Sequence, residues 1–229
     1  MPRKPEPSHP GPTAVNRDKL IEALMALLAE RRFEELGFHE VAARAGVSLA
    51  ACRAEFGSML EVLAAHAKEV DRKVLAGLDS ELIDELPRER LFDVLMRRLE
   101  ALGPYKGAIR SLLGSARRNP PLALALAAVT ARSMQWMLTA ADIKAVGPGG
   151  ALRAQGLALL YASVLRTWVD DDDPGLARTM AALDRELARG ARCAGLLDTL
   201  CRFAPSRRGP GRRSRPRPAE DLDEEPLPA

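Results

Sequence analysis

The chain has 229 residues, of which 47% are hydrophobic but only 4% aromatic, so its apolar material is mostly Ala and Leu. Both are strong helix formers, and no run of Val, Ile and Thr alternates with polar residues as a half-buried strand would. The formal net charge of +3 is too small to indicate a nucleic-acid binder by itself. Together these features exclude a sheet protein and predict an all-α protein.

The cysteines argue against a disulfide-stabilised secreted protein, and the apolar stretches argue against a membrane-spanning protein. Cys193 and Cys201 are eight residues apart on one expected helix, so a rise of about 12 Å separates them, beyond disulfide reach. With Cys52 they suit a reducing cytosol, and we expect a cytoplasmic protein. The first residues lack the apolar core of a signal peptide. The uncharged stretches 119–131 and 154–165 are shorter than the roughly 20 residues that span a bilayer.

Proline marks the organisation of the chain. Eleven of the seventeen prolines lie in segments 1–12 and 204–229, which we expect to be disordered. The other prolines stand where one helical pattern stops and the next begins. We predict a small domain at 13–57 and a helical regulatory and dimerisation domain at 58–203. The predicted helices are 14–29, 38–45, 48–56, 59–78, 88–102, 105–118, 121–145, 150–170 and 175–203, with a short turn of helix at 80–86.

The most specific local pattern joins the second and third predicted helices. Gly46 can adopt the left-handed conformation that ends a helix, and Ser48 can cap the next helix through its hydroxyl. Cys52 and Phe56, four residues apart, then face the core. This spacing predicts a helix-turn-helix with 48–56 as the recognition helix.

The run from Arg17 to Val62 resembles the N-terminal domain of the TetR family of transcriptional regulators. The matching residues occur in order and at the right spacing: Arg17, Ile21, Ala29-Glu30, Phe33, Phe38, Val41-Ala42, Ala45-Gly46-Val47-Ser48 and Phe56-Gly57-Ser58. The resemblance implies a three-helix helix-turn-helix domain followed by a helical ligand-binding and dimerisation domain. It also implies a homodimer that binds operator DNA and is released from it by a small-molecule ligand. The ligand would bind in the helical domain 58–203, here called the body.

Four contact positions depart from the family pattern. Where the family usually has Lys, Tyr, His and Lys, this sequence has Leu49, Arg53, Glu55 and Met59. Of these, only Arg53 can reach a phosphate. The residues expected nearest DNA are Arg17, Arg44, Ser48, Leu49, Ala50, Ala51 and Arg53. The alternative is a helix-turn-helix scaffold that has lost operator recognition.

The charge of segment 13–57 bears on that alternative. It holds six cations and seven acids, whereas a domain that neutralises several phosphates is normally basic. Segment 207–217 carries six arginines, which can compensate from outside the fold, and segment 220–225 follows with five acids.

The body contains methionine and aromatic side chains, which can line an adaptable pocket for a small apolar ligand. The candidate ligand-binding residues are Met96, Tyr105, Met134, Trp136 and Met137. Packing of the helices is the alternative explanation for the same side chains at helical spacing.

Segment 152–163, continued by Trp168, Asp170 to Asp172 and 179–187, is similar to the end of the lipid-binding ubiquinone-biosynthesis accessory family, which shares the TetR fold. Residues Cys193, Leu196, Leu197, Leu200 and Cys201 form an apolar stripe with arginines beside it. Such a stripe can lie on an anionic membrane, which would place a peripheral contact at 191–208. The alternative is that the stripe packs on the body or on a partner subunit.

Small apolar residues predict a homodimer interface on the helices near 150–170 and 175–190: Ala158, Leu159, Ala162, Leu165, Ala181 and Ala182. We expect that the protein is not an enzyme and that it binds neither a metal ion nor a cofactor. The three histidines lack metal-ligand spacing, and 147–150 lacks the strand and lysine of a phosphate loop, so it is expected to be a turn.

Overall fold

The computed structural model describes residues 12–78 and 86–203, and side-chain positions for 16–78 and 86–192. In these ranges the protein is all-helical, as predicted. The elements are α1 (Pro12–Glu30), η1 (Phe33–Glu35), α2 (Phe38–Ala45), α3 (Leu49–Glu55), α4 (Met59–Ala76), α5 (Pro87–Ala101), η3 (Gly103–Tyr105), α6 (Lys106–Ala116), α7 (Pro120–Ala140), α8 (Gly147–Trp168) and α9 (Ala177–Phe203).

Several expectations fall outside the described residues. These are the two tails, except for Pro12, which begins α1, and residues 80–85 of the short turn of helix. The stripe from Cys193 to Cys201 lies on α9, but its side chains, and with them the membrane contact at 191–208, are also outside the description. Within the described ranges, none of the helices is both long enough and apolar enough to cross a bilayer.

The start of α8 corrects one prediction. Residues 147–150, expected to be a turn, form the first turn of this helix. Proline is tolerated in a first turn because its missing N–H would have no intrahelical partner there. The predicted end of the preceding helix at 145 is also wrong. Helix α7 ends at Ala140, and Asp142 follows with a positive φ of 57°.

Gly150 is required at its position because the chain folds back onto it. A Cβ at Gly150 would overlap the backbone carbonyl group of Ala145, whereas a Cβ at Gly149 would meet nothing within 4 Å. We expect Gly150→Ala to lower the free energy of unfolding by about 1–3 kcal/mol, the usual cost of overpacking. Urea denaturation followed by circular dichroism measures it, with Gly149→Ala as the matched control. Equal stabilities of the two variants would contradict this account.

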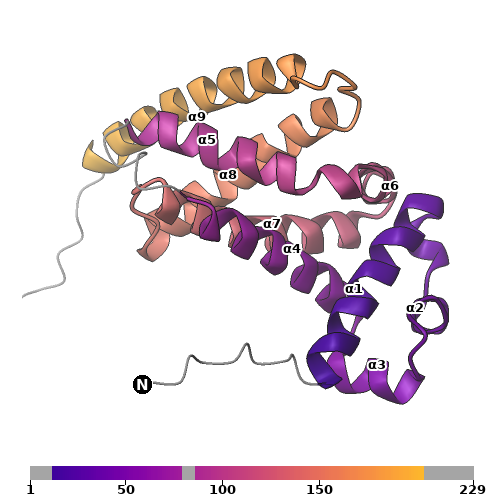
Figure 1. Cartoon of the computed structure of the whole chain (residues 1–229). Helices are drawn as coiled ribbons and strands as arrows, with labels where there is room; N and C mark the ends of the chain where they lie inside the picture. The colour runs from indigo at the N-terminus through magenta and orange to yellow at the C-terminus, as the bar shows by residue number, and fades with distance from the viewer. Residues whose placement is uncertain (1–11, 79–85, 204–229) are drawn as a thin grey trace, which may run out of the picture.

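Two hydrophobic clusters divide the molecule. The head core joins α1, α2 and α3 with parts of α4 and α6. It includes Cys52 and Phe56, as predicted, together with Leu20, Ile21, Leu24, Leu27 and Leu28 of α1. The body core joins α4, α5, α7, α8 and the start of α9. Figure 1 shows α1 to α3 at one end of the molecule and α4 running from them into the body.

Helix α4 belongs to both cores. Val62 and Leu63 are buried in the head core, while Val70 and Val74, two to three turns further on, are buried in the body core. One continuous helix therefore connects the two cores.

Helix α6 also closes the head core, through its contact with α1. Gly107 permits close approach, since a Cβ there would lie 3.3 Å from that of Ala29. The Ser111 hydroxyl donates to the carbonyl of Arg31 at 2.9 Å. Head and body therefore pack directly against each other beside the α4 connection.

Candidate nucleic-acid interface

The turn between α2 and α3 has the geometry that the sequence predicts. Gly46 is left-handed, with φ 66° and ψ 33°, and ends α2. The Val47 N–H donates to the carbonyl of Ala42 at 3.1 Å, which satisfies a carbonyl left open at the helix end. The Ser48 hydroxyl accepts from the Ala51 N–H at 3.1 Å and caps α3.

Two buried residues fix the orientation of α3. The side chains of Cys52 and Phe56 are 1% and 2% exposed and belong to the head core. The opposite side of α3 is exposed at Leu49, Ala50 and Arg53. This short helix therefore presents its outer face to solvent at the end of the molecule, as a recognition helix must.

The seven residues predicted to lie nearest DNA have different surroundings. Leu49 is 51% exposed, Ala50 and Ser48 are exposed, and Ala51 is half-buried. The Ser48 hydroxyl is occupied by the helix cap. Arg53 is exposed and has no hydrogen bond or ion pair with any other described residue.

The other two arginines of that set have partners within the head. Arg44 forms a two-point ion pair with Glu30, at 3.0 and 2.7 Å. The hydrogen bond from Arg44 lowers the pKa of the Glu30 carboxyl below its ordinary value. The guanidinium of Arg17 lies over the ring of Phe56, 4.7 Å from its centroid. The pairing of Arg44 leaves less positive charge on this surface than the arginine count indicates.

The five predicted ligand-binding residues do not converge on one place. Met134 and Met137 are fully buried in the body core, and Met96 is half-buried against it. Tyr105 packs against the head core, and Trp136 is 56% exposed. A ligand site made of these residues therefore remains a prediction.

The sequence reasoning missed a buried polar cluster in the body. Arg98, on α5 and 5% exposed, donates from Nε to Asp71 on α4 at 3.0 Å. It also donates to the Tyr161 hydroxyl on α8 at 2.9 Å and the Ser133 hydroxyl on α7 at 3.4 Å. The sequence contained an indication, because Arg98 stands in the apolar series of its helix: Leu91, Val94, Leu95, Leu99 and Leu102.

These contacts hold charge in a low-dielectric interior. Burial acts against the charged form of Arg98. The Tyr161 hydroxyl and the Asp71 carboxylate outweigh that effect and keep the guanidinium pKa above its ordinary value. Because the partners come from α4, α7 and α8, Arg98 fixes the position of the connecting helix α4 within the body.

His66 lies on α4 near the boundary of head and body. It is 6% exposed and packs edge-on against the ring of Tyr105, with a centroid distance of 4.4 Å. The Tyr105 hydroxyl reaches Glu22 of α1 at 2.7 Å. The Nε2 atom of His66 has no hydrogen-bond partner among the described residues. Burial lowers the pKa of His66 to about 4.

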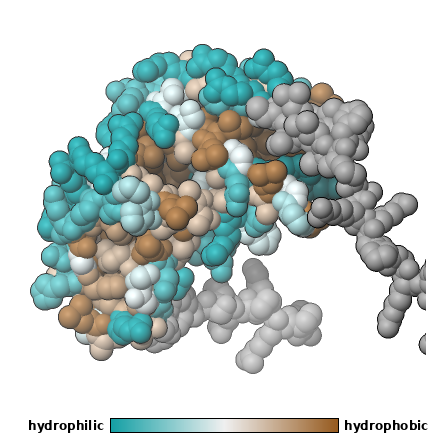
Figure 2. All heavy atoms as spheres, turned by 180° about the vertical axis from the view of Figure 1, so that it is seen from behind, coloured by the Kyte–Doolittle hydropathy of each residue, from teal (hydrophilic) through white to brown (hydrophobic). Residues whose placement is uncertain are grey.

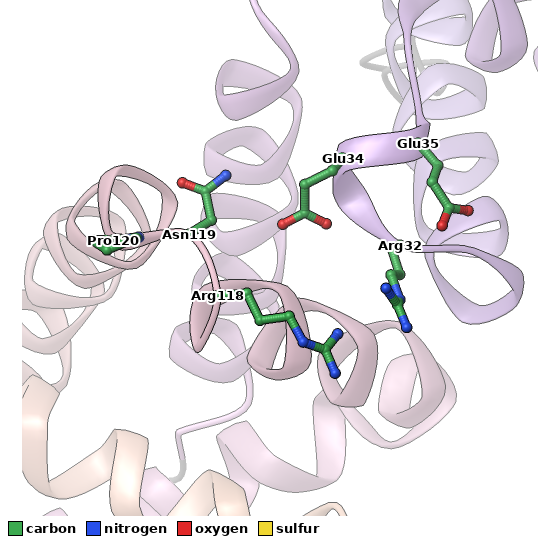
Figure 3. Close-up of a pocket in the computed structure, with 6 residues that line it drawn as sticks. All are labelled: Arg32, Glu34, Glu35, Arg118, Asn119 and Pro120. Carbon is green, nitrogen blue, oxygen red and sulfur yellow. The ribbon is translucent and has the colours of Figure 1, made fainter.

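Two surface pockets lie away from α3. One, of about 360 Å³, lies between η1 and the turn before α7 and is lined by two arginines and two glutamates, with Asn119 and Pro120 (Figure 3). Glu34 faces Asn119 there and is held by the Ser115 hydroxyl at 2.8 Å. The other, of about 560 Å³, lies between α5 and α9 and includes Phe92 and Met180. Neither pocket is lined by the predicted ligand-binding residues.

The predicted dimer residues on α8 and α9 divide between surface and interior. Leu159 is 70% exposed and Ala181 is exposed, Ala162 and Leu165 are half-buried, and Ala158 and Ala182 are buried within the body. Leu152 and Met180 add exposed apolar surface on the same two helices. Figure 2 shows apolar residues in the middle of one face of the molecule, with hydrophilic residues along its upper edge.

No protein-family model matches the chain, and no curated protein matches it. Solved structures of TetR transcriptional regulators do match the chain. That from Nitrosomonas europaea ATCC 19718 is 22% identical, with 76% of this chain and 97% of that chain covered and a TM-score of 0.58. That from Rhodococcus sp. RHA1 is 20% identical, with coverages of 77% and 95% and a TM-score of 0.56.

A third similar structure, a TetR-family regulator from Streptomyces coelicolor, is 16% identical, with coverages of 81% and 84% and a TM-score of 0.52. These likenesses cover most of the chain and almost the whole of the first two neighbours. The chain thus has the all-helical TetR-type fold, as its N-terminal residues predicted.

Proposed function

We propose that this protein is a DNA-binding transcriptional regulator of TetR type, which inserts α3 into the major groove of an operator. The observation that carries the proposal is the capped helix α3, held by Cys52 and Phe56 with its outer face exposed. Residues 13–57 are then the DNA-binding domain and residues 58–203 the regulatory and dimerisation domain. Operator DNA, a second copy of the chain and a small apolar ligand are the proposed partners.

Regulation by a ligand in the body is supported by the packing of α4. Its first half is buried in the head core, and its second half is held by the Asp71–Arg98 contact in the body core. A ligand that changes the packing of α5, α7 or α8 therefore changes the position of the head. A population shift between two such arrangements is sufficient to release DNA.

Arg53 tests the DNA-binding part of the proposal. We expect Arg53→Ala to weaken binding to promoter and unrelated DNA by a similar factor, because a phosphate contact carries no base information. The salt slope should fall by about one unit for each protomer bound. Fluorescence anisotropy at two salt concentrations measures both. Arg132→Ala is the matched control, since Arg132 is exposed on α7 and also lacks a partner among the described residues.

Two results would contradict this proposal. One is the absence of any preference for promoter over unrelated DNA. The other is loss of all binding when residues 204–229 are removed, because the arginines of segment 207–217 rather than α3 would then carry the affinity.

We also propose a homodimer through α8 and α9, so that two copies of α3 bind the two half-sites of one operator. We expect light scattering to give twice the mass of one chain at micromolar concentration. We expect Leu159→Asp to shift the protein to monomer, because it puts a charge into the apolar contact. Leu124→Asp, a matched change at a leucine that is 74% exposed on α7, should leave the dimer intact. A monomeric wild-type protein would contradict the proposed assembly.

A further inference from the structure

The outer face of α3 is apolar except for one arginine. Positions four residues apart lie above each other on a helix, so Leu49 and Arg53 form one row and Ala50 and Ala54 the next. All four are exposed, while Cys52 and Phe56 point into the head core. Apart from Arg53, this face contains no side chain that can hydrogen-bond to a base edge.

The neighbouring polar groups are already engaged. The Ser48 hydroxyl accepts from the Ala51 N–H, and Arg44 is paired with Glu30 at 2.7 Å. The hydrogen-bonding side chains that usually recognise adenine and cytosine, Asn, Gln, Asp and Glu, do not occur on the exposed rows of α3. Within these exposed rows, sequence preference can therefore come only from apolar contact or from Arg53, since Glu55 is half-buried and lies outside them.

Thymine offers the one apolar group in the major groove, its C5-methyl. We propose that Leu49, together with Ala50, recognises thymine by packing on this methyl, so that thymine is preferred opposite the first turn of α3. This inference rests on the proposed function and names what that site reads. Leu49 is suited to the role because it is 51% exposed, lies outside the head core, and is in the part of a recognition helix that contacts base edges.

The thymine methyl can be removed without changing base pairing by substituting deoxyuridine. The preferred site is first selected with the full-length protein from a pool of random-sequence duplexes, and each thymine is then replaced singly. For at least one thymine in each half-site, we expect deoxyuridine to weaken binding on the order of fourfold, the factor that corresponds to about 0.8 kcal/mol for one buried methyl-sized group.

Leu49→Ala tests whether the contact belongs to this residue. The variant should bind the selected site less tightly and lose the discrimination between thymine and deoxyuridine at that position, while its unfolding midpoint stays close to that of the wild type. Leu124→Ala, at an exposed leucine in the body, should keep the full discrimination.

The outcomes separate the inference from the proposed function. If no sequence is enriched, the proposed function fails and the inference fails with it. If a sequence is enriched but deoxyuridine has no effect at any position, only the inference is overturned. Retention of the full thymine preference by Leu49→Ala also overturns it.

Discussion

Replacing Arg98 by Met is expected to lower the free energy of unfolding by about 3–5 kcal/mol. The change removes the guanidinium but leaves Asp71, 6% exposed, as an uncompensated charge in the interior. It also takes a hydrogen-bond donor from the Tyr161 and Ser133 hydroxyls. The same change at an exposed arginine costs the protein little stability, so Arg132→Met on α7 is the control.

A double-mutant cycle separates the loss of the ion pair from the loss of packing. Asp71→Leu combined with Arg98→Met replaces both charges by apolar side chains. It should be more stable than Arg98→Met alone, because no unpaired charge remains buried. The measurement is urea denaturation followed by circular dichroism at one fixed protein concentration, because association would also contribute to stability. A cost below 1 kcal/mol for Arg98→Met would show that Asp71 finds water or another partner.

The second large effect is a loss of stability in mild acid that depends on His66. The folded protein holds the pKa of His66 at about 4, against an ordinary value of 6.5. Burial is the main cause, with nearby Arg98 and Lys73 acting in the same direction and Glu22 and Glu69 opposing them. Below pH 6.5 the unfolded chain therefore binds a proton that the folded chain does not.

The sign of the pH dependence follows from this difference. The contribution of His66 to stability is complete above pH 6.5 and is lost as the pH falls toward 4. A difference of 2.5 between the two pKa values corresponds to about 3 kcal/mol. We expect this dependence to be absent from His66→Gln.

Urea denaturation of the wild type and of His66→Gln between pH 7 and pH 4 measures the difference. Carboxylates with lowered pKa values, such as that of Glu30, act in the same direction, but they contribute equally to both proteins and cancel. His39→Gln is the control, since His39 is exposed on α2. Parallel stability curves for the wild type and His66→Gln would contradict the burial of a neutral histidine at this position.

Under the proposed function, a ligand signal passes from body to head along α4, which carries His66 and contacts Arg98 through Asp71. Asp71 is little more than one turn from His66 on α4. The Asp71 side chain contacts Arg98 on α5, whereas that of His66 contacts Tyr105, which packs against the head core. Variants at either position are therefore expected to alter DNA affinity as well as stability, even though neither residue lies on α3. Measuring DNA affinity and stability in the same set of variants distinguishes the two roles. A positioning residue changes both quantities, whereas a direct DNA contact such as Arg53 changes affinity alone.

The helices and the turn of residues 13–57 could be predicted from sequence because their causes are local. Gly46 and Ser48 act on residues within four positions of themselves. The apolar positions of α1 repeat at helical spacing, so the face that it buries was also evident. Prolines stand in the first turns of α5, α7 and α8, at the predicted boundaries between helices. The glycines of 147–150 predict a turn, but they belong to the start of α8.

Only the tertiary structure decided which residues far apart in the chain contact one another. Arg44 pairs with Glu30, 14 residues away, and Arg98 joins Asp71 and Tyr161 at separations of 27 and 63 residues. Helical periodicity states which face of a helix is buried, but not which helix covers it or at what angle. Those choices depend on how the surfaces of all the helices fit together. They determine that Arg44 is paired, that Arg53 is free of partners among the described residues, and that α4 connects the head core to the body core.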